Sequence, residues 1–380
     1  MNFEFDEEQE RLRDSLRRYL ADRAPIRPYL RSAYGAARGK DDAWNGLADL
    51  GVVGLIGPTT HGGSGGSMVD AAVALEECGR ALYPGPLLAS AIGAISIATA
   101  NGEAGSPGDG TLADLCAGTL VGAVALFETG APTDWRTVAT TVADHDGELR
   151  ASGGKTHVLN AADADVLYLT AREPDGSIGL FVADSHTLGF ELTTIELVDG
   201  SRPCSHVHLQ GVPVRPVVGD AAVIVEDALD RMRTALVVDA VGAAQRALEL
   251  TVDYAKQRIA FGKPIGSFQA IQHLSADMLR AVELARAAAY YSCWAIDAAP
   301  RAEARRAATM AAAFASDELV RLGNTAIQVF GGIGFTWEHD IHLFYKRLLS
   351  ASAILGTADD HLMTLADLVF DAAGDQRGRD

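Results

Sequence analysis

The chain has 380 residues, enough for two or three structural units, and 48% of them are apolar. Its formal net charge of −18 argues against a nucleic acid partner, because neutralising phosphates requires a basic surface. No segment approaches the roughly 20 apolar residues of a membrane span, and the charged N-terminus lacks a secretory signal. The four cysteines are scattered, without the spacing of a metal site. We therefore expect a cytoplasmic protein with reduced thiols and no metal.

The predicted elements fall into three stretches along the chain. Apolar residues at helical spacing predict helices over residues 4–33, 44–50, 69–82 and 87–100. Short apolar runs between Asp-Gly turns then predict antiparallel strands at 121–126, 166–171, 179–183 and 206–209. From about residue 225 the helical period returns and continues into a last helix after Thr357. Helices segregated from strands in this order indicate an α+β protein.

A polar break between two long predicted helices is the most informative segment, YAKQRIAFGKPIGSFQAIQHLSADM at residues 254–278. Arg258 lies where the first helix ends, and Gln269 lies where the second begins. An arginine in that place can bind a pyrophosphate through its planar set of donors. Taken alone, it is also a cation that stabilises a helix C-terminus.

A second helix end carries the run Gln328-Val329-Phe330-Gly331-Gly332-Ile333-Gly334-Phe335. Its glycines permit positive φ angles and a close approach of the backbone to a ligand. A glycine C-cap is the alternative interpretation of the same pattern. Near the C-terminus, Gly356-Thr357 forms a further small-residue pair.

Together these segments resemble the two signatures of the acyl-CoA dehydrogenase family. The resemblance extends to the stretches FEFDEEQERLRDSLRRYL, HGGSGGSMVDAAVALEECGRAL and GGKTHVLNAADADVLYLTAR, so it covers nearly the whole chain. It implies an N-terminal helical domain at residues 1–117, a middle antiparallel β-barrel-like domain at 118–222, and a C-terminal four-helix bundle at 223–380.

The resemblance also implies FAD, an acyl-CoA substrate, electron-transferring flavoprotein as electron acceptor, and a homo- or hetero-oligomer of related subunits. In the family a carboxylate removes the α-proton of the thioester while the β-hydride passes to the flavin. The residues of this chain that match cofactor-binding positions of the family are Arg258, Phe261, Gln269, Gln328, Gly331, Gly332 and Thr357.

The family's catalytic base has no counterpart in the matching positions of this chain. The glutamate usually precedes the Gly-Thr pair, where this chain has Leu355, and leucine cannot accept a proton. Some members place it 26 residues before the conserved arginine, where this chain has Met232. We therefore predict no catalytic residue in the usual places.

Four aspartates lie near the two base positions. Asp359 and Asp360 follow Thr357 in the pattern of a helix N-cap with acids in the first turn. Asp230 lies beside Met232 but on a different helix face, and Asp239 lies two turns further on. We expect structural roles for them, with a relocated base as the alternative.

The predicted β unit departs from the family as well. The loop at residues 127–134 reads FETGAPTD, which keeps only Glu128 and Asp134 of the family pattern, with Thr133 in place of serine. His157 stands where the family has an aromatic residue that shields the flavin.

Three functional hypotheses follow. In the leading one, the chain is a subunit that completes the FAD site of a partner, which carries the base. The second is a self-sufficient dehydrogenase with a displaced base, such as Asp359. The third is a non-catalytic protein that binds acyl-CoA or flavin. The acyl group is left open, although the small residues Ala351, Ser352 and Ala353 suit either a roomy pocket or close helix packing.

Overall fold

The structure, a computed structural model, describes residues 5–37, 39–103 and 110–377. It consists of two compact units, each made of segments that are distant in sequence. The helical unit comprises residues 1–28, 72–83 and 233–380, and the sheet unit comprises residues 29–71 and 84–232. The predicted α+β class is confirmed.

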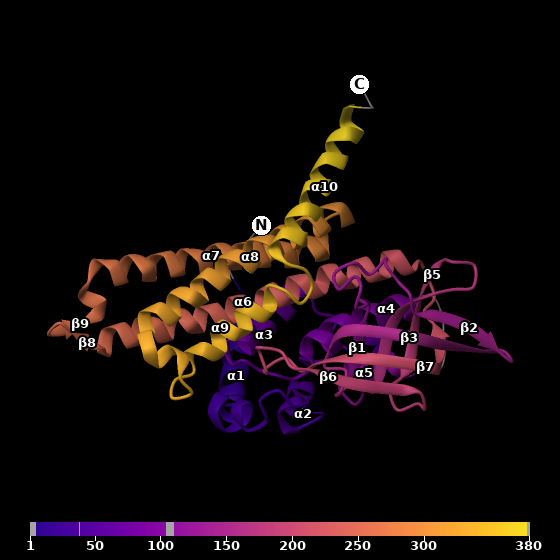
Figure 1. The fold of residues 1–380 in the computed structure, drawn as a ribbon, viewed down its shortest axis with the longest axis horizontal. Coiled ribbons are helices and arrows are strands. Elements are labelled where there is room, and N and C mark those ends of the chain that lie inside the picture. Colours follow the sequence, from indigo (N-terminus) through magenta and orange to yellow (C-terminus); the bar gives the residue numbers. More distant parts are fainter. Residues whose placement is uncertain (1–4, 38, 104–109, 378–380) are drawn as a thin grey trace. The chain divides into compact units, whose positions relative to one another are not determined.

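Long helices make up most of the helical unit (Figure 1). They are α1 (Glu7–Arg23), the C-terminal parts of α3 (Met68–Arg80) and α6 (Ala221–Gln257), α7 (Gln269–Ala298), α8 (Arg301–Phe330), α9 (Ile341–Ala351) and α10 (Ala358–Arg377). Helix α8 packs against α7, α9 and α10. These helices bury apolar stripes against one another, as their period in the sequence predicts.

Glycines set the crossing of α3 and α6 within the helical unit. A Cβ atom at Gly79 would lie 1.9 Å from the carbonyl oxygen of Asp239, and one at Gly242 would lie 1.9 Å from that of Glu76. Since no real Cβ atom tolerates such distances, only glycine allows the two backbones to approach this closely. The crossing brings Glu76 and Glu77 against the middle of α6.

Helix α1 is shorter than the sequence predicts. Asp6 caps its N-terminus by accepting hydrogen bonds from the backbone of Glu8 and Gln9, in a complete capping box. The helix ends at Arg23, and the expected continuation to residue 33 is wrong. Pro25 and Pro28 lack the N–H groups that a helix interior requires, so the chain continues in two short turns, Ile26–Leu30 and Arg31–Ala33.

The sheet unit holds one seven-stranded sheet and several short helices. Its strands are β1 (Gly122–Ala125), β2 (Thr141–His145), β3 (Glu148–Leu159), β4 (Val166–Arg172), β5 (Ile178–Asp184), β6 (Phe190–Ile195) and β7 (Cys204–Pro216). Its helices are α2 (Asp42–Asp49), the turn Thr59–His61, the π-helical segment Leu87–Ala94, α4 (Ile95–Glu103) and α5 (Thr111–Cys116). The pairing order is β1-β4-β2-β3-β7-β5, β5 also pairs with β4, and β6 pairs with β7.

The sheet is mixed, so the prediction of an antiparallel sheet is wrong where β4 pairs with β1 and β2. Strand β1 pairs with β4 in parallel from Gly122 opposite Val166, and β2 meets β4 in parallel at Thr141 and Arg172. The other pairings are antiparallel. A parallel pair needs a long crossover connection, and the forty residues between β1 and β4 provide one.

The four cysteines are free and buried, in agreement with the prediction of reduced thiols. Within the described ranges, no helix combines the length and apolar character that crossing a membrane requires. The division into domains 1–117, 118–222 and 223–380 remains a prediction.

Candidate functional site

The break between α6 and α7 is a tight, exposed turn. Arg258 follows the last residue of α6, and a two-residue hairpin pairs β8 (Ile259–Ala260) with β9 (Lys263–Pro264). Phe261 and Gly262 form its tip with φ angles of 52° and 79°, and the Phe261 side chain is 95% exposed. A short turn, Ile265–Ser267, then leads into α7. Both residues have the positive φ angles that a tight two-residue hairpin requires, and this conformation costs free energy for phenylalanine.

The C-terminus of α8 forms the second exposed turn. Gly331 ends the helix with a φ angle of 66°, and a 3-10 turn follows over Gly331–Phe335. A Cβ atom at Gly331 or Gly332 would meet nothing within 4 Å. The C-cap interpretation therefore holds for Gly331, and both glycines leave their backbone open to an approaching ligand.

The two turns meet at one end of the helical unit. One turn of helix before Arg258, the Tyr254 ring stacks on the Phe330 ring with centroids 4.3 Å apart. The Tyr254 hydroxyl also donates to the carbonyl oxygen of Phe330, at 3.4 Å. The structure thus brings together the two sequence signatures, which are about 70 residues apart in the chain.

Three polar side chains at this end lack partners. Arg258, Gln269 and Gln328 are exposed, and none of them forms a side-chain hydrogen bond or ion pair with any residue that the structure describes. A guanidinium and two amides beside open glycine backbone provide donors that fit a dinucleotide pyrophosphate and its sugars.

Thr357 is the N-cap of α10, and its side chain is hydrogen-bonded within α10 and not to the two turns. Its hydroxyl accepts from the backbone N–H of Asp360 and donates to the Asp360 carboxylate, which lies 2.8 Å away. The Asp360 carboxylate also accepts from the backbone N–H of Thr357, and this hydrogen bond lowers the pKa of Asp360. The expected N-cap is therefore present, and Asp360 is a structural acid.

The first base position is filled by a buried apolar side chain. Leu355 is 6% exposed and borders a small cavity of about 20 Å³, together with residues of α6, α8 and α9. His361 borders the same cavity, and burial together with the positive charge of Arg233 lowers its pKa to about 4. The imidazole packs so closely on Gly356 that a Cβ atom there would lie 2.8 Å from it.

The second base position is apolar as well. Met232 is 4% exposed. A Cβ atom added to Gly93 would lie 2.9 Å from the Met232 sulfur and would also contact Val124. Neither of the two positions at which the sequence analysis looked for the base therefore carries a side chain that accepts a proton.

The nearby acids differ in their environments. The Asp239 carboxylate is buried and accepts two hydrogen bonds from Arg347, at 3.0 and 2.7 Å, and Arg347 also donates to the carbonyl oxygen of Tyr83. Asp239 is thus the satisfied structural acid that the sequence suggested. Asp230 is buried, whereas Asp359 is exposed and without a partner among the described residues.

The two acids retained in the β-unit loop have structural roles. Glu128 is buried, pairs with the buried Lys155 at 2.8 Å and accepts from the backbone N–H groups of Ala139 and Thr140. Burial alone would raise the pKa of Glu128, but the hydrogen bond from Lys155 lowers it. Asp134 holds its own turn by accepting from the backbone of Arg136.

His157 belongs to a small polar cluster in the sheet unit. The Thr156 hydroxyl lies 3.1 Å from Nδ1 of His157 and 2.8 Å from Nδ1 of His206. Burial and the nearby His206 lower the pKa of His157. The histidine is therefore hydrogen-bonded and neutral at pH 7.

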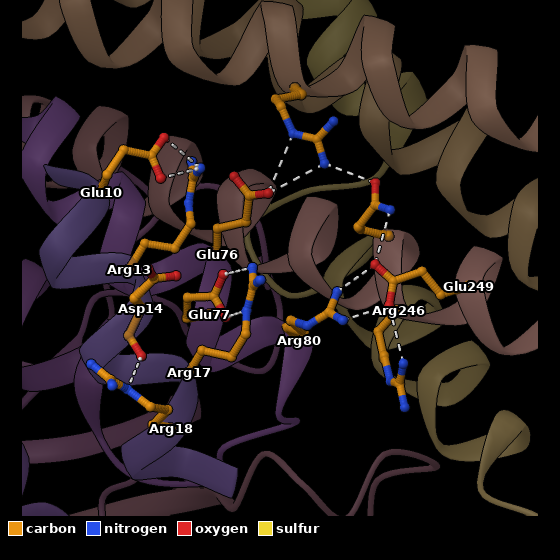
Figure 2. A network of polar contacts seen from close by, with 12 residues as sticks. Glu10, Arg13, Asp14, Arg17, Arg18, Glu76, Glu77, Arg80, Arg246 and Glu249 are labelled. Atoms are coloured by element: carbon orange, nitrogen blue, oxygen red, sulfur yellow. Dashed lines mark hydrogen bonds and ion pairs between the residues drawn. The ribbon is translucent and has the colours of Figure 1, made fainter. Parts of the chain in front are cut away.

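A charge network inside the helical unit was not found from the sequence (Figure 2). Glu77 accepts two hydrogen bonds from Arg17, and Glu249 accepts from Arg80 at 2.7 Å and from Gln245 at 3.1 Å. Burial alone would raise the pKa of Glu249, but these hydrogen bonds lower it to about 2. The two ion pairs, Arg17–Glu77 and Arg80–Glu249, join residues that are 60 and 169 positions apart, so no local sequence pattern predicts them. The network ties α1 and α3 to α6.

Comparisons with known proteins agree with the resemblance. Residues 6–105 match the family described as "Acyl-CoA dehydrogenase, N-terminal domain", and residues 222–370 match "Acyl-CoA dehydrogenase, C-terminal domain". The acyl-CoA dehydrogenase IpdE2 of Mycobacterium tuberculosis is 30% identical over 96% of this chain and 98% of its own length. The acyl-CoA dehydrogenase FadE34 of the same organism is 33% identical over 85% of this chain, but only 42% of its own length.

Solved structures show the same fold. A variant of the Tcur3481-Tcur3483 steroid ACAD has a TM-score of 0.86 at 29% identity and covers 97% of this chain and 99% of its own. Butyryl-CoA dehydrogenase from Megasphaera elsdenii has a TM-score of 0.88 at 25% identity and covers 97% and 100%. The chain therefore belongs to the acyl-CoA dehydrogenase family, FAD-dependent enzymes that dehydrogenate the CH–CH bond of acyl-CoA thioesters.

Proposed function

We propose that this chain is the base-deficient subunit of a heteromeric acyl-CoA dehydrogenase. It supplies donors to an FAD that is shared with a partner subunit, and the partner carries the carboxylate that removes the α-proton. Electron-transferring flavoprotein is the proposed electron acceptor, and the cytoplasm is the proposed location. The observation that carries the proposal is the contrast between exposed, unpaired donors at one place and buried, apolar base positions at two others.

The proposed cofactor contacts are Arg258, Phe261, Gln269, Gln328, Gly331 and Gly332 at the two meeting turns, and Thr357 at the start of α10. Arg258 would bind the pyrophosphate, and the amides of Gln269 and Gln328 would bind polar groups beside it. When bound, FAD supplies the acceptor for the hydride. The exposure of these donors supports a ligand held jointly with another subunit, because a dinucleotide enclosed by one chain would sit in a formed pocket.

The base deficiency is supported by Leu355 and Met232, which are both buried and apolar. A leucine leaves its backbone N–H in place, so this loop retains the means to polarise a thioester carbonyl but not to deprotonate the α-carbon.

Two relatives support a heteromeric assembly. The steroid ACAD carries a double designation, Tcur3481-Tcur3483. In FadE34 the region matching this chain is 42% of the length, which leaves room for a second unit of similar size. We therefore propose a related chain with glutamate before its Gly-Thr pair as the partner. A steroid-derived CoA thioester belongs among the substrates to be tested, beside butyryl-CoA.

Purification of the chain with and without that partner tests the proposal. We expect the chain alone to hold little FAD and to leave it oxidised in the presence of any acyl-CoA, and the complex to hold FAD and reduce it. Full FAD occupancy and thioester oxidation by the chain alone would reject the proposal. Ligand binding without flavin reduction in any pairing would instead identify a non-catalytic binding protein.

A displaced base is the second candidate, and the exposed, unpartnered carboxylate of Asp359 favours it. Two substitutions separate the candidates. If Asp359→Ala abolishes turnover of the chain alone, the displaced base is correct. If Leu355→Glu creates turnover where there was none, the position before Gly356 is a vacant base position, as the leading proposal requires.

A further inference from the structure

A cavity of about 490 Å³ lies within the helical unit, among α1, the segment that follows it, α3 and α6. This volume is in the range of small-molecule binding sites. Part of its lining is apolar and comes from α1 and the proline-containing segment after it, with Leu20, Ala24 and Ile26. The charged part of the lining includes four arginines, Arg17, Arg27, Arg80 and Arg246. None of the residues that line the cavity belongs to the cofactor contacts proposed above.

Carboxylates orient two of these arginines individually. The Nε and Nη2 atoms of Arg17 donate to Glu77 at 2.9 and 2.6 Å (Figure 2). The Arg17 side chain is 49% exposed, whereas that of Glu77 is 4% exposed. Arg27 donates to Asp340 at 3.3 Å and is again the more exposed member of its pair. In both pairs the carboxylate is shielded and the guanidinium stays accessible, so the acids fix the arginines and leave them open to a further anion.

The other two arginines share a single carboxylate. Arg80 donates to Glu249 at 2.7 Å, and Arg246 donates to the same carboxylate at 3.0 Å (Figure 2). The pKa of Glu249, about 2, keeps this group ionised near neutral pH. Among the described residues, the four arginines thus bind three carboxylates. The cavity therefore has an excess of one positive charge, in a chain whose net charge is −18.

The arginines retain donors for a ligand. A guanidinium has five N–H donors. Arg17 and Arg27 use Nε and Nη2 within the described part of the chain, which leaves Nη1 of both side chains without a protein acceptor there. Arg246 uses Nη1 alone. Because these side chains are already held in place, an anion that accepts from them immobilises few additional rotamers.

We propose that this cavity binds a small organic carboxylate, whose anionic group contacts the arginines and whose short apolar body contacts Leu20, Ala24 and Ile26. One negative charge neutralises the single excess positive charge, and arginine forms strong charge-assisted hydrogen bonds with a carboxylate. Burial of the apolar body adds a favourable contribution that an inorganic anion lacks. The inference goes beyond the proposed function and does not depend on it. A charge network that only stabilises the helical unit is the competing interpretation.

Calorimetric titration of the full chain tests the proposal, with hexanoate, acetate and 1-hexanol as probes. We expect hexanoate to bind more tightly than acetate, which lacks the apolar body, and more tightly than 1-hexanol, which lacks the charge. Hexanoate binding should weaken as the salt concentration rises, because salt screens the attraction between the charges.

Arg246 is the arginine whose removal disturbs the fold least, since Glu249 keeps its hydrogen bonds from Arg80 and Gln245. Arg246→Met should weaken hexanoate binding about tenfold or more, because a charged donor is lost. Arg246→Lys should restore part of the affinity. Arg18→Met is the matched control, because it removes the same charge from an exposed position on α1 that does not line the cavity. It should leave hexanoate binding unchanged.

Ala21 allows a second test that removes no contact of the network. Ala21 is exposed on α1 and lines the cavity. Ala21→Glu places an additional carboxylate there and should weaken hexanoate binding far more than Ala21→Gln, which adds a side chain of the same size without the charge. Urea unfolding of both variants shows whether the fold is retained.

Each outcome supports one interpretation. Equal hexanoate affinities of Ala21→Glu and Ala21→Gln, or undiminished binding by Arg246→Met, would overturn the site. Binding of 1-hexanol as tight as that of hexanoate would overturn the role of the arginines. If the wild-type chain bound no hexanoate up to millimolar concentration, the charge network would be structural only. The FAD content of the partner complex tests the proposed function separately, so these outcomes leave it standing.

Discussion

Two regions of the helical unit differ in the exposure and the hydrogen bonding of their side chains. At the meeting turns of α6–α7 and α8, the polar side chains of Arg258, Gln269 and Gln328 are exposed and lack partners among the described residues. Around Leu355, by contrast, the side chains of Leu355 and His361 are buried, and Asp360 is hydrogen-bonded to Thr357 at the start of α10. In our proposal the first region binds a ligand, and the second contributes to stability. The contrast predicts that substitutions in the two regions affect different measurements.

The largest effect on stability is expected at the buried ion pair. The Arg347 side chain is 3% exposed, and Asp239→Asn removes its charge partner. Because an unpaired buried charge is costly, we expect the free energy of unfolding to fall by about 3–5 kcal/mol. Urea unfolding measures it. Asp317→Asn, which breaks the exposed pair with Arg321, is the matched control and should cost less than about 1 kcal/mol. Equal losses in the two variants would contradict the assignment of Asp239 as a structural acid.

The free energy of unfolding should depend on pH because the imidazole of His361 is buried. Its pKa is about 4 in the folded chain against an ordinary value of 6.5, so the unfolded chain binds the proton more tightly. Stability should therefore be unaffected above pH 6.5 and fall by up to about 3 kcal/mol as the pH is lowered from 6.5 to 4. His361→Phe should flatten this part of the curve of unfolding free energy against pH. An unchanged slope would show that His361 is not buried as a neutral group.

Leu355 should matter for stability and not for cofactor binding. Leu355→Ala removes apolar atoms that are 94% buried, and we expect a loss of about 2 kcal/mol, at the low end for leucine because the residue lies in a loop. The FAD content of the partner complex should stay as in the wild type. Leu362→Ala on the surface of α10 is the control and should change stability by less than about 0.5 kcal/mol.

Arg258 should show the opposite behaviour. Arg258→Met should lower the FAD affinity of the partner complex about tenfold or more, since a charged donor to the pyrophosphate is lost. The free energy of unfolding should change by less than about 0.5 kcal/mol, because the side chain is exposed and forms no hydrogen bond or ion pair with the residues that the structure describes. Arg321→Met on the exposed face of α8 should leave the FAD affinity unchanged. If Arg258→Met lowered the free energy of unfolding and left the FAD affinity unchanged, Arg258 would serve stability and not cofactor binding, which would contradict the proposed difference between the two regions.

The sequence predicted the long helices because the period of their apolar residues is local, whereas it missed the strands β2 and β3. Residues 302–329 carry the apolar stripe of α8, and residues 166–171 carry that of β4. Strand β6 was missed as well, since most of its residues are exposed and its apolar-polar alternation covers only four residues. Pro25 and Pro28 explain the early end of α1, and the prediction of a helix to residue 33 did not take them into account.

Contacts between side chains that are distant in the sequence were harder to predict. The sequence identified Glu128 as a match to a cofactor loop, whereas the structure shows it bound to Lys155, 27 residues away. The buried network of Glu77 and Glu249 likewise depends on the crossing of α3 and α6 at Gly79 and Gly242. Contacts of this kind depend on tertiary packing, which no short pattern encodes. The N-cap formed by Thr357 and Asp360 was predictable because both partners lie within one helical turn.

The central claim is that no carboxylate of this chain deprotonates the substrate. Its most direct test is anaerobic reduction of FAD by acyl-CoA in the complex with the proposed partner, after the glutamate before the partner's Gly-Thr pair has been changed to glutamine. The account predicts that FAD stays bound and fully oxidised, since Leu355 and Met232 offer no base. Reduction of the flavin by this complex would contradict it.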